Sequence, residues 1–570
     1  MFSITYSSDL TLLRKAPQSS VATSFLTSTR LLHAPLVSKI AGGCCIRYAT
    51  KLVWGFSTPI RYDVSTPSKG SRIYCMRVLP GLYRRLAPLA LLVYSAAAVA
   101  CDGLASGQTL WIRLSSPVSS YTSKPGDAVH AVLTEAVTCD KTVVLPVGTS
   151  IDGVVRSVRK VGWGIQHETA ALDLRFNSAH LPPDTEVSIA AAVVEVENAR
   201  EQVSSKGVIQ GIRSSDTPEG RINSRLKHLP TWNPYSDVGL IVYKATFPIF
   251  PEPEIYYPAG TDMRLKLTSP VQSLPVVAVT PPESPADTLA EVEVEGMAPS
   301  LPWRSTTVNL TAADVVNLAF VGSREQVEAA FQQAGWNTSD PFTKHSFVHT
   351  FYAFLNDSSY DQAPMKTLLL NGKPADLNFQ KSLNSYNRRD HLRVWQWGET
   401  SDSQAVWLSS STHDTQATLS VRHHQFVHHI APDIDDERST VLRDLQLAGC
   451  VKSVHLAPRP GVSNFTQNAN GDLVRTDGDL AIVELKECQP LVPGLPAATS
   501  ATNFKAGNHV FRYLRKQILT FRSDIWRANI IYGAYDLARM SIETFRHHPV
   551  PPPTQQAKAE TKPVQTEGME

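Results

Sequence analysis

The sequence lacks the motifs by which most enzyme classes are identified. It contains no G-x-S-x-G, no H-E-x-x-H, no P-loop and no C-x-x-C. Seven cysteines in 570 residues are too few for a fold built on disulfides. The 54 basic and 52 acidic side chains nearly balance, which excludes the overall positive charge typical of nucleic-acid-binding proteins. The sequence therefore identifies no reaction, and nucleic acid is not an expected partner.

The chain has enough apolar residues for several folded domains. Hydrophobic residues make up 42% of it and charged residues 19%, as in globular proteins. Residues 1–75 differ, because they carry nine Lys/Arg, two acidic residues and twenty Ser/Thr. We interpret them as an upstream extension ahead of a true start at Met76, with a transit peptide as the alternative.

A secretory signal layout follows at residues 76–101. Three arginines precede an apolar run over residues 86–100, which is too short to span a bilayer. No later segment reaches spanning length. We therefore expect export, to the periplasm or to the membrane surface. Cys101 directly follows Ala100 and resembles a bacterial lipoprotein site, so lipidation of Cys101 is an alternative to plain cleavage.

Residues 105–273 predict an all-β module of barrel or sandwich type, because short β-type runs alternate with Pro/Gly turns. The stretch 107–118 aligns without gaps to 260–271, so the opening and closing strands have the same pattern of alternating apolar residues. Three segments, 123–127, 143–149 and 151–153, together resemble the β-domain of TrbI-type conjugal-transfer proteins over residues 107–193. That resemblance implies a barrel-like envelope module that self-associates; an unrelated small β-sandwich is the alternative.

A Pro- and Glu-rich linker is expected at residues 274–304, before an α+β two-layer sandwich at residues 305–490. The second domain begins with a buried strand at Val315–Val321. A capping box at Ser323–Gln326 follows and predicts a helix that ends at Gly335. Later strands are expected at His391–Trp397, Gln404–Ser410 and Leu419–Ile430, with a helix at about 435–448.

Several motifs of this domain occur in the order found in one family. They are Asp314–Val327, Ala334–Trp336, His391–Trp395 and His428–Arg438. Together they resemble the LssY-like C-terminal domain over about residues 305–457. The resemblance implies a fold and a cell-envelope context, and no reaction.

Polar side chains crowd into the same domain and define three candidate sites. The candidate acid–base residues are His391, His413 and Asp414. The candidate anion-binding residues are Arg389, Arg393 and Arg438. A divalent metal is the only candidate cofactor, and its candidate ligands are His428, His429, Asp433 and Asp435. The alternative is that these residues have only structural roles. Asp433 or Asp435 is then a helix cap, and Arg393 and Arg438 form salt bridges.

Residues 505–548 predict an amphipathic basic helix, with seven Lys/Arg and three acidic residues over 507–548. Contact with a membrane surface through 507–548 and packing on the β module are the alternatives. Residues 549–570 predict a disordered tail. Cys450 and Cys488 could pair in an oxidising compartment.

The function predicted is an interaction or assembly role in the envelope, with other envelope or secretion proteins or a second copy as partners. A hydrolase acting on phosphorylated or lipid-linked substrates is the alternative, so whether the protein is an enzyme stays open.

Overall fold

The computed structural model describes nine stretches of the chain and a few single residues elsewhere. The stretches are 103–139, 142–163, 167–181, 185–213, 216–227, 251–272, 289–420, 425–498 and 509–527. They all belong to one compact unit, residues 90–570. The predictions for 1–75, 76–101, Cys101, the first part of the linker and 549–570 lie outside the described residues.

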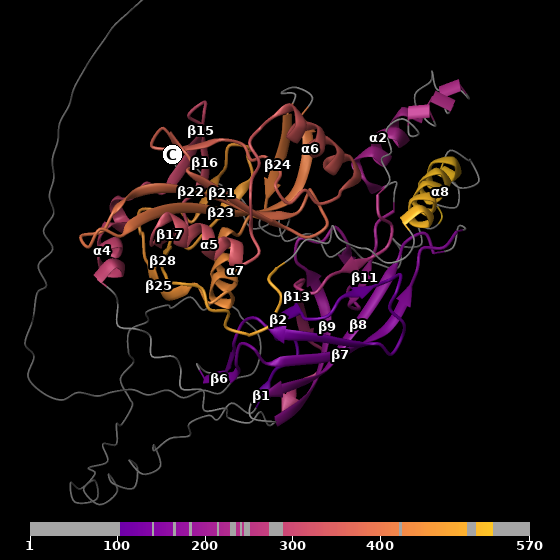
Figure 1. Cartoon of the computed structure of the whole chain (residues 1–570), viewed down its shortest axis with the longest axis horizontal. Helices are drawn as coiled ribbons and strands as arrows, with labels where there is room; N and C mark the ends of the chain where they lie inside the picture. The colour runs from indigo at the N-terminus through magenta and orange to yellow at the C-terminus, as the bar shows by residue number, and fades with distance from the viewer. Residues whose placement is uncertain are drawn as a thin grey trace, which may run out of the picture. The chain divides into compact units, whose positions relative to one another are not determined.

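The N-terminal module is a closed β-barrel (Figure 1). Its sheet runs in the order β10-β11-β8-β7-β4-β2-β13-β9, and β8 also pairs with β9, which closes a ring of six strands. The ring consists of β2 (Thr109–Leu114), β4 (Ala128–Leu133), β7 (Ser150–Arg159), β8 (Ala171–Leu181), β9 (Thr185–Val196) and β13 (Asp262–Leu267). The predicted all-β, barrel-like module is thereby confirmed.

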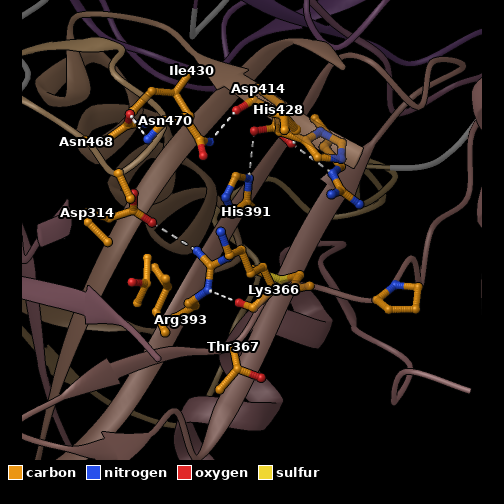
Figure 2. Close-up of a pocket in the computed structure, with 18 of the residues that line it drawn as sticks. Asp314, Lys366, Thr367, His391, Arg393, Asp414, His428, Ile430, Asn468 and Asn470 are labelled. Atoms are coloured by element: carbon orange, nitrogen blue, oxygen red, sulfur yellow. Dashed lines mark hydrogen bonds and ion pairs between the residues drawn. The ribbon is translucent and has the colours of Figure 1, made fainter. Parts of the chain in front are cut away.

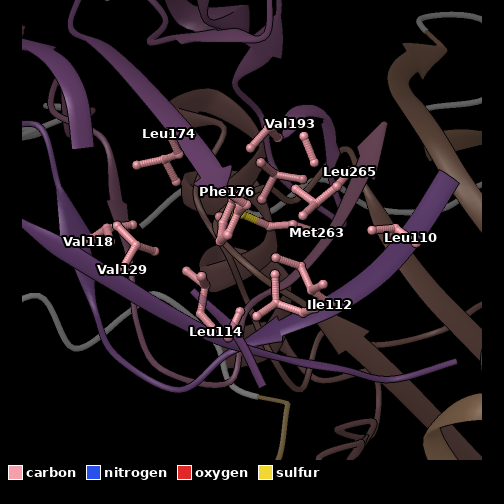
Figure 3. Packing of buried hydrophobic residues seen from close by; sticks show 14 of the residues in the cluster. Leu110, Ile112, Leu114, Val118, Val129, Leu174, Phe176, Val193, Met263 and Leu265 are labelled. Atoms are coloured by element: carbon pink, nitrogen blue, oxygen red, sulfur yellow. The ribbon is translucent and has the colours of Figure 1, made fainter. Parts of the chain in front are cut away.

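The two sequence-similar strands, β2 and β13, lie side by side in the barrel. They pair antiparallel, with Leu110 opposite Leu265 and Ile112 opposite Met263. All four side chains are buried in the barrel core (Figure 3). Because side chains of a strand alternate between its faces, the shared apolar pattern places both sets inside the barrel.

Shorter elements flank the barrel. They are β1 (Gly103–Leu104), β3 (Val118–Ser119), β5 (Val137–Cys139), β6 (Thr142–Leu145), β10 (Gln202–Val203), β11 (Val208–Gln210), α2 (Pro218–Lys227), β12 (Tyr256–Tyr257) and β14 (Val271–Gln272).

The C-terminal domain combines helices with a mixed sheet in the order β18-β21-β22-β23-β17-β28-β25. Only β17 and β28 of this path pair in parallel, and β24 adds to β23. The strands are β17 (Leu318–Val321), β18 (Asn337–Thr338), β21 (Leu377–Ser382), β22 (Arg389–Glu399), β23 (Ala405–Ser420), β24 (Gln425–Ile430), β25 (Val451–Ala457) and β28 (Leu480–Leu485).

Helices and small sheets complete the domain. They are α4 (Leu289–Met297), the 3-10 turn η2 (Ala298–Ser300), α5 (Arg324–Gln333), α6 (Lys344–Asn356), α7 (Ile434–Leu447), β15 (Arg304–Thr307), β16 (Ala312–Val315), β19 (Leu368–Leu370), β20 (Lys373–Pro374), β26 (Phe465–Gln467) and β27 (Leu473–Arg475).

Both faces of the large sheet are buried in apolar clusters. Leu318 and Phe320 of β17 join the cluster that contains residues of α5 and α7, and we call this side the α7 face. Ala319 and Val321 point to the other cluster, which contains residues of α4 and β19. Alternate residues of one strand therefore belong to opposite sides of the domain.

The predicted linker is too long at its C-terminal end. Residues 289–297 form α4, which contacts β28, and its Val294 is fully buried. Burial of apolar side chains in this stretch outweighs its Glu-rich composition, on which the linker prediction rested.

The predicted strand–helix unit is confirmed with a shorter strand, because β17 begins at Leu318 and Val315 instead ends β16 of another sheet. Ser323 accepts a hydrogen bond from the Gln326 backbone, and the Gln326 side chain accepts one from Ser323, which is a complete capping box for α5. Gly335 follows with a φ of 89°, and a Cβ there would collide with the backbone of Ala498. A residue other than glycine would therefore be strained at this helix end.

Two further predictions concern the end of the chain. Cys450 and Cys488 form a disulfide. Helix α8 (His509–Arg527) packs on the barrel module, since Leu519 is part of the barrel core cluster and Arg515 pairs with Glu254. Most of 528–548 lies outside the described residues. Within the described part of the chain, no helix is both long and apolar enough to span a bilayer.

Candidate functional site

The charged run at the start of β22 is divided between the two faces of the sheet. Strand alternation directs Arg389, His391 and Arg393 to the face opposite α7, while Asp390 points to the α7 face. The neighbouring strand β23 repeats this split. In register, Arg389 lies opposite Asp414 and Asp390 lies opposite His413.

The predicted acid–base set is therefore not in one place. Strand β23 extends to Ser420, ten residues beyond the predicted end, so His413 and Asp414 are adjacent strand residues on opposite faces. His391 and Asp414 share one pocket, which we call the Asp414 pocket, and His413 lines another, the Asp390 pocket.

The Asp414 pocket is a cavity of about 340 Å³. Figure 2 shows residues of β22, β23 and β24 converging on it. It brings together five of the ten candidate residues within the described chain. These are Arg389, His391, Arg393, Asp414 and His428.

Asp414 is the hub of the pocket and is completely buried. Its carboxylate lies 2.9 Å from His428 Nδ1, 3.1 Å from Arg389 Nε and 3.5 Å from His391 Nδ1. Burial acts to raise its pKa, but His391, His428 and Arg389 together hold the pKa well below its usual range. Asp414 is therefore a buried anion in contact with two imidazoles.

The other ring nitrogen of each imidazole also has a partner. His391 Nε2 lies 3.0 Å from Thr412 Oγ1, and His428 Nε2 lies 3.1 Å from Tyr386 Oη. Burial lowers the pKa of His391 to about 3, and burial likewise lowers the pKa of His428 against the opposing pull of Asp414. Both imidazoles are therefore neutral near pH 7.

The Asp414 pocket contains a second ion pair. Arg393 donates to Asp314 Oδ2 at 3.1 Å and to the backbone oxygen of Lys366 at 3.2 Å. Burial raises the pKa of Asp314, although Arg393 opposes the shift. The Lys366 side chain lines the pocket and is exposed. Three cations thus surround the cavity, against two carboxyl groups.

The remaining candidates have separate partners outside this pocket. His429 Nδ1 lies 2.7 Å from Asp472, and Arg438 binds Asp477 at 2.7 Å. Asp433 caps α7 by accepting from the Asp435 backbone, and it pairs with Arg475.

Asp435 accepts hydrogen bonds from Thr476 Oγ1 and the Asp477 backbone. The four predicted metal ligands do not converge, because His428 and His429 face opposite sides of β24 while Asp433 and Asp435 fix the start of α7. These residues instead form helix caps and salt bridges, as in the alternative interpretation of the sequence that required no chemistry.

The Asp390 pocket, on the α7 face, has a volume of about 630 Å³. In it, His413 Nδ1 lies 2.6 Å from Asp390 Oδ1, and Asn198 of the barrel module donates to Asp390 Oδ2 at 2.6 Å. Burial acts to raise the pKa of Asp390, but the bond from His413 and the charges of His413 and Lys381 lower it below its usual range. Burial, with the charges of Asp390 and Glu197, raises the pKa of Glu437 well above its usual range.

Sequence reasoning missed four residues of these pockets as site residues: Asp314, Lys366, Tyr386 and Asp390. A signal was available for Asp314 and Asp390, since each acid interrupts a run that forms a buried strand, and buried acids require partners. Lys366 and Tyr386 lie in connections outside the strands and helices, where the pattern gives no such signal.

Comparisons with known proteins identify the C-terminal domain. Residues 297–480 match the family model described as the LssY C-terminus, which confirms the predicted resemblance. The curated proteins contain no match.

Among solved structures, ComB10 of the Com type IV secretion system of Helicobacter pylori matches with 9% sequence identity. The match covers 30% of this chain and 89% of that chain, with a TM-score of 0.18. At that TM-score the likeness carries no functional argument.

Proposed function

We propose that the protein is an exported cell-envelope protein with an interaction or assembly role, and that its LssY-type domain binds a small anionic group in the Asp414 pocket. The ligand class is a phosphate, free or as part of a lipid-linked molecule. The observation that carries the proposal is the gathering of Arg389, Arg393 and Lys366 around one concave space.

The donors in this pocket suit a phosphate. Guanidinium groups bind phosphate oxygens through paired N–H donors, and a buried site of low dielectric strengthens such bonds. Arg389 and Arg393 are each fixed by a carboxylate, so their orientation is set before a ligand arrives. Lys366 has no carboxylate within salt-bridge distance among the described residues, so its charge is available to an anion.

Equilibrium binding tests this site. We expect the purified protein to bind glycerol 3-phosphate, or phosphatidylcholine vesicles only when they contain phosphatidic acid; the two probes distinguish a soluble from a lipid-linked phosphate. Lys366→Gln should weaken binding about tenfold or more, the value of a charged hydrogen bond. Because Lys366 is exposed, this variant should fold normally.

Arg438→Gln is the matched control, because Arg438 was an equal candidate by sequence but binds Asp477 outside the pocket. Arg438→Gln should bind like the unmodified protein. Equal binding by Lys366→Gln and the unmodified protein, or no binding of either probe, would contradict the proposed site.

A second candidate function is hydrolysis of a phosphorylated or lipid-linked substrate. One observation favours it: a single buried carboxylate contacts Nδ1 of two neutral imidazoles, an arrangement that can orient a general base. Turnover of p-nitrophenyl phosphate that is lost in His428→Gln and kept in His429→Gln would support it. Ligand binding without turnover would leave the pocket as a binding site.

Export is supported by the disulfide between Cys450 and Cys488, because disulfides persist in oxidising compartments. The signal layout of residues 76–101 agrees with it. Mass spectrometry of the protein from the native envelope fraction should find the two cysteines linked and a first residue at or just before Cys101. An intact N-terminus, with free thiols in the cytosolic fraction, would contradict export.

A further inference from the structure

Three ligand-type side chains converge in the Asp390 pocket, on the opposite side of the sheet from the Asp414 pocket. Asp390 of β22 and His413 of β23 are paired in register, and Glu437 comes from the first turns of α7. One ligand atom from each side chain lies within 4.8 Å of the others. Ligand atoms from three elements therefore lie close enough together to surround one ion, unlike the four ligands expected from the sequence.

One side-chain oxygen of this group is buried without a hydrogen-bond partner. Glu437 is 4% exposed, and within the described chain its Oε1 accepts no hydrogen bond. Folded proteins rarely leave a buried carboxylate oxygen in this state, because its lost hydration is not replaced. Glu437 also lines the pocket, where a bound cation would supply the missing partner.

The surroundings contain an excess of acidic groups. Around the pocket, five buried carboxyl groups accompany three buried cationic side chains. The carboxyl groups belong to Glu197, Asp262, Asp390, Glu437 and Asp444, and the cations are Arg113, Lys381 and Arg443.

We infer that Asp390, His413 and Glu437 bind one divalent transition-metal ion, zinc or manganese, at the junction of the barrel and the LssY-type domain. One imidazole and two carboxylates suit such ions, whereas magnesium and calcium prefer all-oxygen sites. The inference is independent of the Asp414 pocket.

The neighbouring groups are arranged to hold the ligands in place. Asn198 Nδ2 donates to Asp390 Oδ2 at 2.6 Å, which fixes the carboxylate from the barrel side. The adjoining cavity of about 630 Å³ leaves room for water or a further ligand on an ion held by three side chains. Because Asn198 belongs to the barrel module and lies 192 residues before Asp390 in the chain, metal binding there would couple the barrel to the sheet.

Calorimetric titration of chelator-treated protein with Zn²⁺ and with Mn²⁺ tests the inference. We expect about one ion per chain and a rise in the thermal midpoint on binding. Glu437→Gln keeps the shape of the side chain and removes its charge, so it should weaken binding at least about tenfold. His413→Gln should do the same. Circular dichroism confirms that each variant is folded.

The matched controls are His429→Gln and Asp435→Asn, which remove an imidazole and a carboxylate from the set expected by sequence. Both should bind the ion like the unmodified protein. No binding by the unmodified protein would overturn the inference, as would unchanged binding by Glu437→Gln. Loss of binding in the controls alone would also overturn it and would move the ion to β24 and α7. If His413→Gln does not fold, metal binding by Glu437→Gln alone decides whether the inference holds.

Discussion

Asp414 and Asp390 show how a single side chain acquires its role from its position on a strand. Both are buried aspartates opposite an arginine or a histidine on the paired strand. Asp414 contacts Arg389 and two imidazoles, whereas Asp390 contacts His413 and a barrel asparagine. The two carboxylates thus organise two different pockets from neighbouring strands of one sheet.

Asp414→Asn tests the hub role. The substitution leaves Arg389 buried without its carboxylate partner, so we expect a loss of about 3–5 kcal/mol in the free energy of unfolding. Asp433→Asn is the control, because asparagine is an equally good helix cap and the pair with exposed Arg475 contributes about 0–1 kcal/mol. Denaturant titration measures both, and equal effects of the two substitutions would argue against the hub role.

The pH dependence of stability tests the burial of His428. Asp414, Arg389 and Tyr386 surround this imidazole, and burial holds its pKa below the value of about 6.5 in unfolded chains. Its contribution to stability is therefore present above about pH 6.5 and is lost as the pH falls below that value, because the unfolded chain takes up the proton first.

We expect the difference in unfolding free energy between pH 7.5 and pH 5.5 to be smaller in His428→Gln than in the unmodified protein. Denaturant titrations at the two pH values measure this. The same pH dependence in both proteins would mean that His428 is not held neutral by the fold.

At the scale of elements, strand length decided how far the site could be predicted. The β-rich N-terminal module and the α5 unit followed from local patterns, because capping boxes and strand alternation are encoded within a few residues. Five of the pocket residues were candidates only because polar side chains crowd into that part of the sequence. The extent of β23 did not follow. Residues 411–420 are polar and Thr-rich, and they form a strand because β22 and β24 pair with them.

This long-range pairing places His413 and Asp414 on opposite faces, which no local pattern in that stretch reveals. The same limit applies to α4, where Val294 is buried by β28, far away in the sequence. Tertiary burial, rather than local composition, made the difference in both cases.

The closing strand of the barrel, β13, allows a direct test of the sequence similarity between β2 and β13. Leu265 of β13 is completely buried opposite Leu110. Leu265→Ala should lower the free energy of unfolding by about 2–5 kcal/mol, through lost burial and the cavity left behind. Leu456→Ala, at a side chain that is 48% exposed, should change it by less than about 0.5 kcal/mol. Comparable losses in a denaturant titration would contradict the closed barrel.

At the scale of the whole molecule, a buried ionic cluster links the barrel to the LssY-type domain. Arg113 of β2 contacts Asp262 at 2.8 Å and Asp444 of α7 at 3.0 Å. Lys381 of β21 contacts Asp444 at 2.7 Å and Glu197 of the barrel module at 2.8 Å. Buried charges that share partners across two modules make their stabilities interdependent.

Lys381→Met tests this coupling. The substitution removes a buried cation and leaves its carboxylate partners on both modules less balanced. We expect the calorimetric unfolding of the unmodified protein to occur in one transition, and the variant to lose about 3–5 kcal/mol of stability. An unchanged midpoint would show that the modules are stabilised independently of Lys381.

The most direct test of the central claim, an anion site in the Asp414 pocket, is X-ray diffraction from crystals soaked in tungstate. Tungstate mimics phosphate, and its anomalous scattering marks its position. We expect a peak within hydrogen-bonding distance of Arg393 and Lys366. Diffraction without a peak in this pocket, or with peaks confined to other surfaces, would contradict it.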